Sequence, residues 1–154
     1  YKQKTVAAWI YDPVQQTMLQ AELGAGCSLN GAKLATINFS GATADINGAL
    51  STKYLPELMK PKANTGARSL GVTRASGCAG FDYRALVTGE YQFVFYYRTL
   101  VWDHAPGVLI AQESGACTGR LDGTPYLPAS NKLGLICASD KNIWGKIRNL
   151  LVEP

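Results

Sequence analysis

The chain has 154 residues, long enough for a substantial hydrophobic core, and its 47% hydrophobic and 17% charged content excludes an intrinsically disordered protein. The net charge of +4 is spread along the sequence without a basic cluster, so we expect no nucleic-acid partner, whereas a phosphorylated small molecule is compatible. Because no apolar run reaches the length of a membrane span and no signal peptide is visible, we expect no membrane contact and a cytoplasmic location.

Antiparallel strands are expected at the start of the chain. Thr5–Tyr11 is a β-rich apolar run that ends at the turn signal Asp12-Pro13, and Gln16–Leu23 alternates loosely as its hairpin partner. Asn30-Gly31 is the strongest hairpin signal in the sequence. The segment that follows, Ala35–Asn47, is rich in Ser, Thr, Gly and Asn, and we interpret it as a connector.

The next elements are expected to be short. In chain order they are a strand, one or two helical turns, a loop and a second strand, at Ala49–Lys53, Tyr54–Lys60, Pro61–Gly66 and Arg68–Arg74. Ser76 is a favourable N-cap residue for a helix over Gly77–Thr88, and Gly89 suits the end of that helix.

A strand expected over Tyr91–Tyr97 leads to the most informative segment of the sequence. The hydrophobic period changes at Asp103, which predicts a helix from Asp103 to Ser114, with Asp103 as the N-cap and Gly115 at the end. Because Pro106 has no N–H, the usual donor to an N-cap carboxylate would be missing, and one Asp103 oxygen would stay free for a group outside the helix.

The last part of the chain is expected to add two strands and a helix. Cys117–Leu121 is a short strand, and Leu133–Ala138 is apolar on both faces, as is typical of the centre of a parallel sheet. Ser139-Asp140 is expected to begin the final helix. Its apolar stripe consists of Ile143, Trp144, Ile147, Leu150 and Leu151.

This order of elements predicts an α/β fold, with a layered mixed or parallel sheet flanked by helices and preceded by a short antiparallel β segment. We divide the chain into residues 1–40, which hold the antiparallel strands, and residues 41–154, which form a C-terminal α/β domain.

The cysteines are expected to be buried free thiols in a reducing compartment, because none forms a C-x-x-C pair and a single histidine cannot complete a zinc site. They are Cys27, Cys78, Cys117 and Cys137.

The segment Trp102–Ala116, with the pattern Trp-Asp-x-Ala-Pro-Gly-x-Leu-Ile-x-x-Glu-Ser-Gly-Ala, resembles the second signature of the inositol monophosphatase family of magnesium-dependent phosphatases. A strand that ends in Tyr-Asp-Pro and the segment Gly24–Gly31 are similar to that family in the same places. The resemblance implies an αβαβα phosphatase fold, of which this sequence supplies the C-terminal half, and a homodimer of the full-length protein.

The residues alone favour a plain helix N-cap at Asp103, whereas the length of the resemblance implies that Asp103 is a ligand of Mg²⁺, the expected cofactor. The family's other metal ligands lie in an upstream glutamate and in an Asp-Pro-x-Asp-Gly-[Thr/Ser] motif, and neither is present in this sequence. Asp12-Pro13 is not that motif, because Val14 and Gln15 follow it.

The segment Ser76, Gly77, Cys78 and Ala79 resembles the family's Gly-[Ser/Thr/Cys]-Ala segment at a helix start, which implies contact with the substrate. Capping and close packing explain the same residues. Tyr96, also assigned to the substrate side, lies seven residues before Asp103, where inositol-specific members carry a glutamate that contacts a substrate hydroxyl. Tyrosine at this position argues against inositol itself.

Several other polar residues receive no role at this stage. We expect the single histidine to be packed or at the surface and the arginines to be solvated or paired at the surface, and we assign no chemistry to the acid within the 77–88 helix. These residues are His104, Arg74, Arg98, Arg120 and Asp82.

The resemblance implies Mg²⁺-dependent hydrolysis of a small phosphomonoester, an inositol, polyol or sugar phosphate, by metal-activated water. Two alternatives stay open. One is a bisphosphate nucleotidase or fructose-bisphosphatase of the same superfamily, and the other is a non-catalytic fragment or binding module without the N-terminal metal ligands. We expect the isolated 154-residue chain to be inactive, because one carboxylate holds Mg²⁺ weakly.

Overall fold

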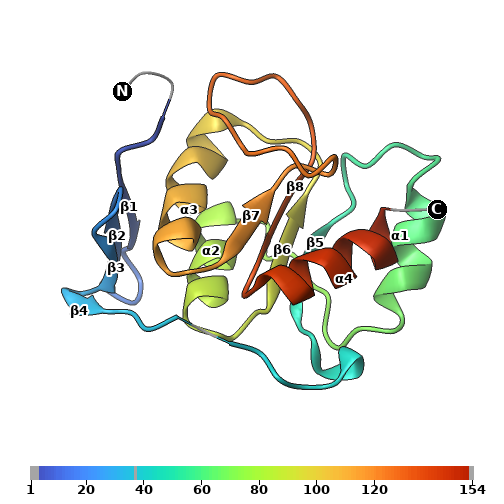
Figure 1. Cartoon of the computed structure of the whole chain (residues 1–154), viewed down its shortest axis with the longest axis horizontal. Helices are drawn as coiled ribbons and strands as arrows, with labels where there is room; N and C mark the ends of the chain where they lie inside the picture. The colour runs from blue at the N-terminus through green and yellow to red at the C-terminus, as the bar shows by residue number, and fades with distance from the viewer. Residues whose placement is uncertain (1–3, 37, 153–154) are drawn as a thin grey trace.

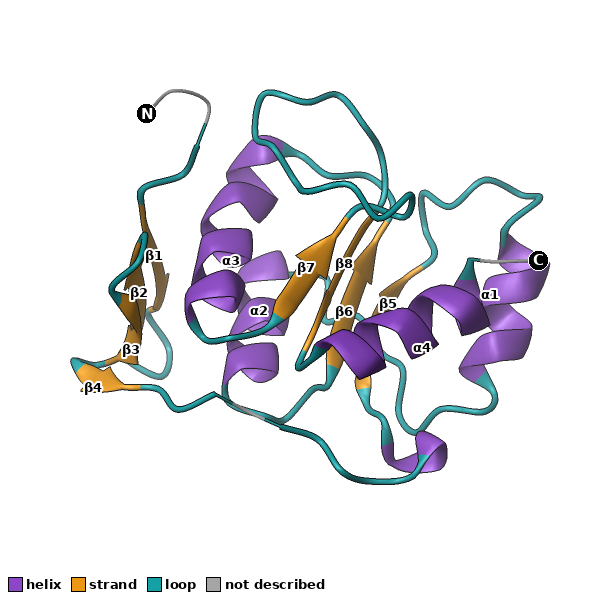
Figure 2. Cartoon of the chain, viewed as in Figure 1, coloured by secondary structure: helices purple, strands orange, loops and turns teal. Residues whose placement is uncertain are grey.

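The computed structural model describes residues 4–36 and 38–152, which form four successive layers (Figure 1). An antiparallel sheet, sheet A, lies against helices α2 and α3, and a second sheet, sheet B, covers the other side of these helices (Figure 2). Helices α4 and α1 form the last layer, beyond sheet B. The α/β fold class predicted from the sequence is therefore confirmed.

Sheet A has the strand order β1-β2-β3-β4, and all of its pairings are antiparallel, as predicted for the start of the chain. The strands are β1 (Ala7–Asp12), β2 (Thr17–Glu22), β3 (Gly26–Leu29) and β4 (Ala32–Lys33). The predicted turn at Asn30-Gly31 joins β3 to β4, and both residues have the positive φ angles, 49° and 82°, that favour these residue types.

Sheet B is mixed, with the order β5-β6-β8-β7. Its strands are β5 (Gly48–Ser51), β6 (Phe93–Tyr96), β7 (Cys117–Gly119) and β8 (Leu135–Ala138). Only the β5–β6 pair is parallel, and β8 is antiparallel to both of its neighbours. The expectation of a parallel environment for β8 was therefore wrong. Its apolar run reflects burial on both faces, which a central antiparallel strand between two helical layers also requires.

The described residues form the α-helices α1 (Lys60–Ala67), α2 (Ala79–Val87), α3 (Val101–Glu113) and α4 (Lys141–Leu151), and a short 3₁₀ helix, η1, covers Thr43–Asp45. Asp140 is the N-cap of α4, as predicted, and accepts hydrogen bonds from the backbone N–H groups of Asn142 and Ile143. The remaining helix starts differ from the predictions. Cys78 rather than Ser76 is the N-cap of α2, and Leu100 rather than Asp103 is the N-cap of α3.

Helix α1 occupies a segment that the sequence analysis assigned to a loop. Pro61 is tolerated because it lies in the first turn of the helix. Contact with α4 stabilises this helix, and a Cβ atom on Gly66 would lie only 2.1 Å from the carbonyl oxygen of Leu150. The strand expected over Arg68–Arg74 is also absent, since Thr73 forms only an isolated bridge to Gly48.

Three apolar clusters hold the layers together. The cluster between sheet A and the central helices contains Ala8, Leu19, Ala21, Cys27, Val87, Leu109 and Ile110. Alternate residues of β6 then face opposite sides of sheet B, because Val94 packs toward the central helices and Phe93 and Phe95 pack toward α1 and α4. The shared clusters fix the position of α2 and α3 between the two sheets.

The close approach of α2 and α3 depends on Gly107. A Cβ atom at this position would lie 2.0 Å from the ring of Tyr83, which is fully buried on α2. This contact brings the first turns of both helices to the same end of sheet B.

No helix within residues 4–36 and 38–152 is both long and apolar enough to cross a membrane. The division at residue 40 stays a prediction.

Candidate functional site

A hollow of about 600 Å³ lies where the end of β6 meets the first turns of α2 and α3, with β1 along its outer side. Five of the six predicted site residues line this hollow, which we call the central pocket: Gly77, Cys78, Ala79, Tyr96 and Asp103. Ser76 lines an adjoining hollow of about 520 Å³ between β1 and α2. The fold thus brings together residues from two separate stretches of sequence, and their roles in binding stay predictions.

Asp103 is the third residue of α3 and is exposed at the central pocket. Its backbone N–H donates to the carbonyl oxygen of Leu100 at 3.1 Å. Within the described residues its carboxylate forms no hydrogen bond or ion pair, so its oxygens are available to a ligand. The free carboxylate expected from the sequence is present, but for a different reason, because Asp103 lies inside the first turn rather than at the N-cap.

The donor set around Asp103 fits one ligand of Mg²⁺ but not a complete site. Mg²⁺ in proteins is held by oxygen ligands, commonly one or two carboxylates together with substrate oxygens and waters. In the part of the chain that the structure describes, no group of three or more His, Cys, Asp or Glu side chains is placed to hold a metal ion. A magnesium site here would need further ligands from outside this set.

The loop before α2 forms one wall of the pocket. Gly77 has a φ of +85°, a conformation that favours glycine, and a Cβ atom there would meet nothing within 4 Å. The hydroxyl of Ser76 accepts a hydrogen bond from the N–H of Cys78 at 3.1 Å and donates to its carbonyl oxygen at 3.0 Å. Ser76 therefore stabilises the loop. Ala79 and Gly80, in the first turn of α2, line the pocket, so the backbone N–H groups at the start of this helix lie beside it.

Asp82 is a site-related residue to which the sequence analysis assigned no role. It is 0% exposed, accepts a hydrogen bond from the backbone N–H of Ser76 at 3.2 Å, and accepts a short hydrogen bond from the hydroxyl of Tyr96. Burial and the Asp82 carboxylate raise the pKa of Tyr96 well above its usual value. The signal in the sequence was an acidic residue among apolar neighbours, Tyr83, Leu86 and Val87, in a segment predicted to be a helix. Such a position indicates a buried acid.

His104 borders the central pocket but is packed, as expected. It is 3% exposed, and its Nδ1 lies 3.1 Å from the hydroxyl of Tyr83. Burial lowers the pKa of His104 to about 4, although the Asp103 carboxylate and a hydrogen bond to the Arg98 backbone oppose this shift. The imidazole is therefore neutral near pH 7.

Cationic and aromatic side chains surround the mouth of the pocket. The guanidinium of Arg98 lies 3.6 Å from the ring centre of Tyr54, and Lys53 and Arg98 both line the pocket. Trp9 and Trp102 are 62% and 71% exposed on its sides. Such an arrangement can attract an anion and can also contact a planar ring.

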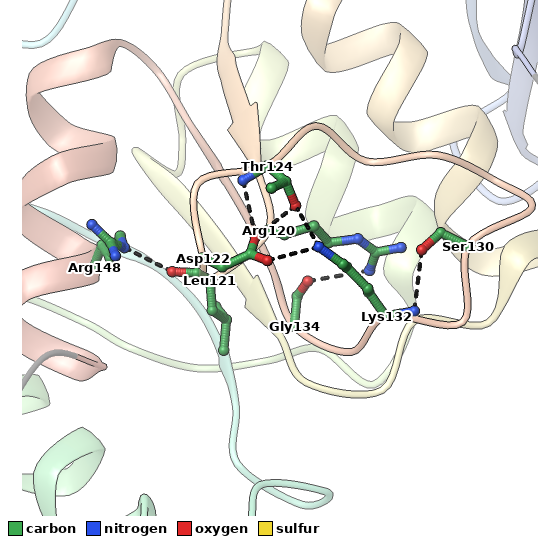
Figure 3. A network of polar contacts seen from close by, with 8 residues as sticks. All are labelled: Arg120, Leu121, Asp122, Thr124, Ser130, Lys132, Gly134 and Arg148. Carbon is green, nitrogen blue, oxygen red and sulfur yellow. Dashed lines mark hydrogen bonds and ion pairs between the residues drawn. The ribbon is translucent and has the colours of Figure 1, made fainter.

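Arg120 contradicts the expectation of a surface arginine, because it is only 1% exposed. Its Nη1 donates to the Thr99 hydroxyl at 2.9 Å. The same Nη1 donates to the Gly134 carbonyl at 3.2 Å (Figure 3). Its guanidinium also lies 4.5 Å from the ring centre of Tyr126. Since Thr99 immediately precedes the N-cap of α3, Arg120 supports the start of the helix that carries Asp103.

The cysteine expectation was correct in part. All four thiols are free, and Cys27 and Cys137 are buried, but Cys78 is exposed and Cys117 is half-buried. Cys78 is exposed because the loop before α2 borders the pocket.

The sequence of this chain is similar to proteins named Nus factor SuhB. It is 29% identical to the one from Vibrio cholerae over 158 residues, covering 97% of this chain and 57% of that protein. It is 28% identical to the one from Escherichia coli K12 over 130 residues, covering 79% of this chain and 47% of that protein. The chain thus spans about half the length of these relatives.

The fold is similar to solved structures of inositol monophosphatases. Inositol monophosphatase-II from Staphylococcus aureus matches with a TM-score of 0.86 at 22% identity, covering 99% of this chain and 57% of that one. A structure described as an IMPase/NADP phosphatase complexed with NADP and Ca²⁺ matches with a TM-score of 0.84 at 18% identity, with the same coverage of 99% and 57%. At these identities the likeness shows the fold.

The family assignment comes from the sequence match. Residues 1–153 match the inositol monophosphatase family, which is nearly the whole chain. The segment Trp102–Ala116, which carries the resemblance to this family, covers most of α3 and the turn that follows it. Its first residues line the central pocket. This chain therefore belongs to the inositol monophosphatase family.

Proposed function

We propose that this chain supplies half of the active site of a phosphatase that hydrolyses a small phosphomonoester, with a polyol or sugar phosphate as the substrate class. One observation carries this proposal: Asp103 offers a carboxylate that has no partner among the described residues, at a pocket that also contains the N-terminal turn of α2. A helix N-terminus favours a phosphate group, and a free carboxylate favours a cation.

In this proposal each wall of the pocket has a separate task. The N–H groups at the start of α2 and the side chains of Lys53 and Arg98 would attract and orient the phosphate. Asp103 would hold Mg²⁺, which when bound supplies an activated water and neutralises charge on the phosphate. His104, buried and neutral, would hold the first turn of α3 in place through Tyr83.

The whole active site requires more than these residues. Asp103 alone holds Mg²⁺ weakly, so the remaining ligands would come from other parts of a full-length, cytoplasmic protein, which we propose to be a homodimer. A non-catalytic binding module is the competing function, because the structure describes only one free carboxylate at the pocket. We expect the 154-residue chain by itself to show no appreciable turnover.

A nucleotide phosphate is a second candidate substrate, favoured by a specific observation. Three exposed aromatic side chains, Trp9, Tyr54 and Trp102, border the same pocket and could stack on a planar base. One similar solved structure is described as SaIMPase-II with bound 2'AMP, with a TM-score of 0.85.

The test is phosphate release from a panel of sugar, polyol and nucleotide monophosphates as Mg²⁺ is titrated. We expect Mg²⁺-dependent turnover from a preparation whose intact mass shows a longer chain that carries the remaining metal ligands. We expect this turnover to be lost in Asp103→Asn. Glu57→Gln is the matched control, because Glu57 is an exposed carboxylate paired only with Lys60. Turnover that survives Asp103→Asn, or that does not respond to Mg²⁺, would contradict the proposal.

A further inference from the structure

Strand β1 has a row of backbone groups that form no hydrogen bond within the described residues. The carbonyl oxygen of Val6 accepts a hydrogen bond from the N–H of Leu23 at 2.9 Å, and β1 continues from there antiparallel to β2. Because hydrogen-bonded and non-hydrogen-bonded pairs alternate along an antiparallel ladder, the N–H and C=O groups of Ala7, Trp9 and Tyr11 point away from β2. They lie along the edge of sheet A, where β1 is the last strand.

The other sheet edges in the described part of the chain are short or partly covered. At the opposite edge of sheet A, β4 has two residues, one of which is Lys33. In sheet B, β7 has three residues, and the start of β5 is covered because Gly48 forms backbone hydrogen bonds with Val72 and Arg74. Strand β1 has six residues and contains neither lysine nor proline, the residue types that commonly protect an edge strand from pairing. It is therefore the edge to which a further strand can add.

The sequence of β1 is complementary to itself. In an antiparallel pair of two β1 strands, the residues whose edge groups bond must face one another, and a two-fold axis at Trp9 satisfies this condition. Trp9 then faces Trp9 of the second copy, and Ala7 faces Tyr11. The small Ala7 side chain leaves room for the Tyr11 ring. Trp9 and Tyr11 are 62% and 55% exposed in the single chain, and the pairing covers part of both.

The charges at the two ends of β1 favour the antiparallel arrangement. Asp12 is the last residue of the strand, and Lys4 lies shortly before its first residue. With the axis at Trp9, Asp12 faces Val6 of the second copy, so Lys4 of that copy lies diagonally across from Asp12, within reach of a long side chain. A parallel pair would instead place like charges beside each other at both ends.

The same register provides an apolar side chain for the adjoining hollow of about 520 Å³ between β1 and α2, which Ile10, Asp12 and Val14 line. Residues that face each other in two paired strands have their side chains on the same face of the sheet. Val6 of the second copy, opposite Asp12, therefore lies on the face that borders this hollow. Val6 is 42% exposed in the single chain, so the pairing buries apolar surface on both copies.

We infer that two copies of this chain associate by antiparallel pairing of their β1 strands about a two-fold axis at Trp9, which joins the two copies of sheet A into one continuous sheet. The pairing gives partners to the edge groups of Ala7, Trp9 and Tyr11. Because a single strand pair forms a small interface, we expect a dissociation constant on the order of 1–100 μM. The pairing requires neither Mg²⁺ nor a phosphorylated substrate, so its test and that of the proposed phosphatase can fail separately.

The first measurement is sedimentation equilibrium of the 154-residue chain from about 1 to 500 μM, with a reducing agent present so that no disulfide forms. We expect the average mass to rise from near 16.5 kDa toward twice that value. Trp9→Lys places a charge at the centre of the pairing and should weaken the association by at least about 10-fold.

Gln20→Lys is the matched control, because Gln20 is exposed and faces Trp9 across the β1–β2 pair but belongs to an interior strand. Its association should equal that of the wild type, and circular dichroism checks that both variants are folded. A mass that stays near 16.5 kDa at every concentration, or equal weakening by both substitutions, would overturn the inference.

The second measurement tests the register by disulfide cross-linking in a Cys78→Ser background, since Cys78 is exposed. The Cα atoms of a hydrogen-bonded antiparallel pair lie about 5.5 Å apart, within the range of about 4.4–6.8 Å that a disulfide spans. Trp9→Cys should therefore cross-link to itself under mild oxidation. Ala7→Cys mixed with Tyr11→Cys should cross-link several-fold more than either variant alone. Equal cross-linking of all these samples, or none in Trp9→Cys, would contradict the pairing about Trp9.

Discussion

Two regions on either side of the start of α3 use their polar side chains in opposite ways. In the loop 120–134, charged side chains are paired: Asp122 accepts hydrogen bonds from Thr124 and Lys132, and the Lys132 Nζ lies 2.9 Å from the Asp122 carboxylate (Figure 3). At the central pocket, the Asp103 carboxylate has no hydrogen-bond or ion-pair partner within the described residues. The paired region stabilises the fold, whereas the unpaired Asp103 carboxylate is where we propose that a cation binds.

The largest effect should come from the buried member of the paired region. Arg120→Ala removes the donor to Thr99 and Gly134 and leaves a void beside Tyr126, so we expect a loss of about 3 kcal/mol in the free energy of unfolding. Chemical denaturation measures this loss. Arg120→Met, which keeps most of the volume, should lose less. Equal losses would show that the hydrogen bonds, rather than packing, dominate.

A pH effect of similar size should come from His104, between the two regions. Its pKa is lowered from 6.5 to about 4 in the folded protein, so the folded state favours the neutral ring. The stability that this provides is present above pH 6.5 and is lost as the pH falls toward 4, by about 3 kcal/mol in total. The free energy of unfolding is measured at several pH values for the wild type and for His104→Gln. The stability of the variant should fall less than that of the wild type as the pH is lowered. Parallel pH profiles would contradict this assignment.

The exposed members of the paired region should matter much less than Arg120. Hydrogen bonds from Thr124 and Lys132 hold the pKa of Asp122 well below its usual range, but its side chain is about half exposed and screened by solvent. We expect Asp122→Asn to lower the melting temperature far less than Arg120→Ala, by an amount that shrinks in high salt. A melting temperature as low as that of Arg120→Ala would mean that the loop depends on this ion pair.

The smallest effect on stability should come from Asp103. Because its carboxylate has no hydrogen-bond or ion-pair partner in the described part of the chain, Asp103→Asn should change the free energy of unfolding by less than about 0.5 kcal/mol. The same variant should lose any stabilisation by added Mg²⁺ in a thermal shift measurement. A large loss of stability without Mg²⁺ would show that Asp103 has a structural role instead.

The correct and incorrect sequence predictions differ in how local their causes are. The turn at Asn30-Gly31 and the N-cap at Asp140 were predicted because each depends on side chains within a few residues. Helix α1 was missed because its contact with α4, through Gly66, joins segments far apart in the sequence. For the same reason, burial of Arg120 could not be inferred from its neighbours in the sequence.

The sequence by itself determined the family, the α/β fold class and five residues that line one pocket. These features could be predicted because hydrophobic period, turn chemistry and the Trp102–Ala116 pattern each depend on residues that are close together in the sequence. Only the tertiary structure decided that Asp82 joins Ser76 to Tyr96 and that Arg120 binds Thr99 just before α3. It also decided that the Asp103 carboxylate, in the first turn of α3, has no partner among the described residues. The physical reason is that a hydrogen bond between distant elements exists only after the apolar clusters have fixed the distance between the helices and the sheets.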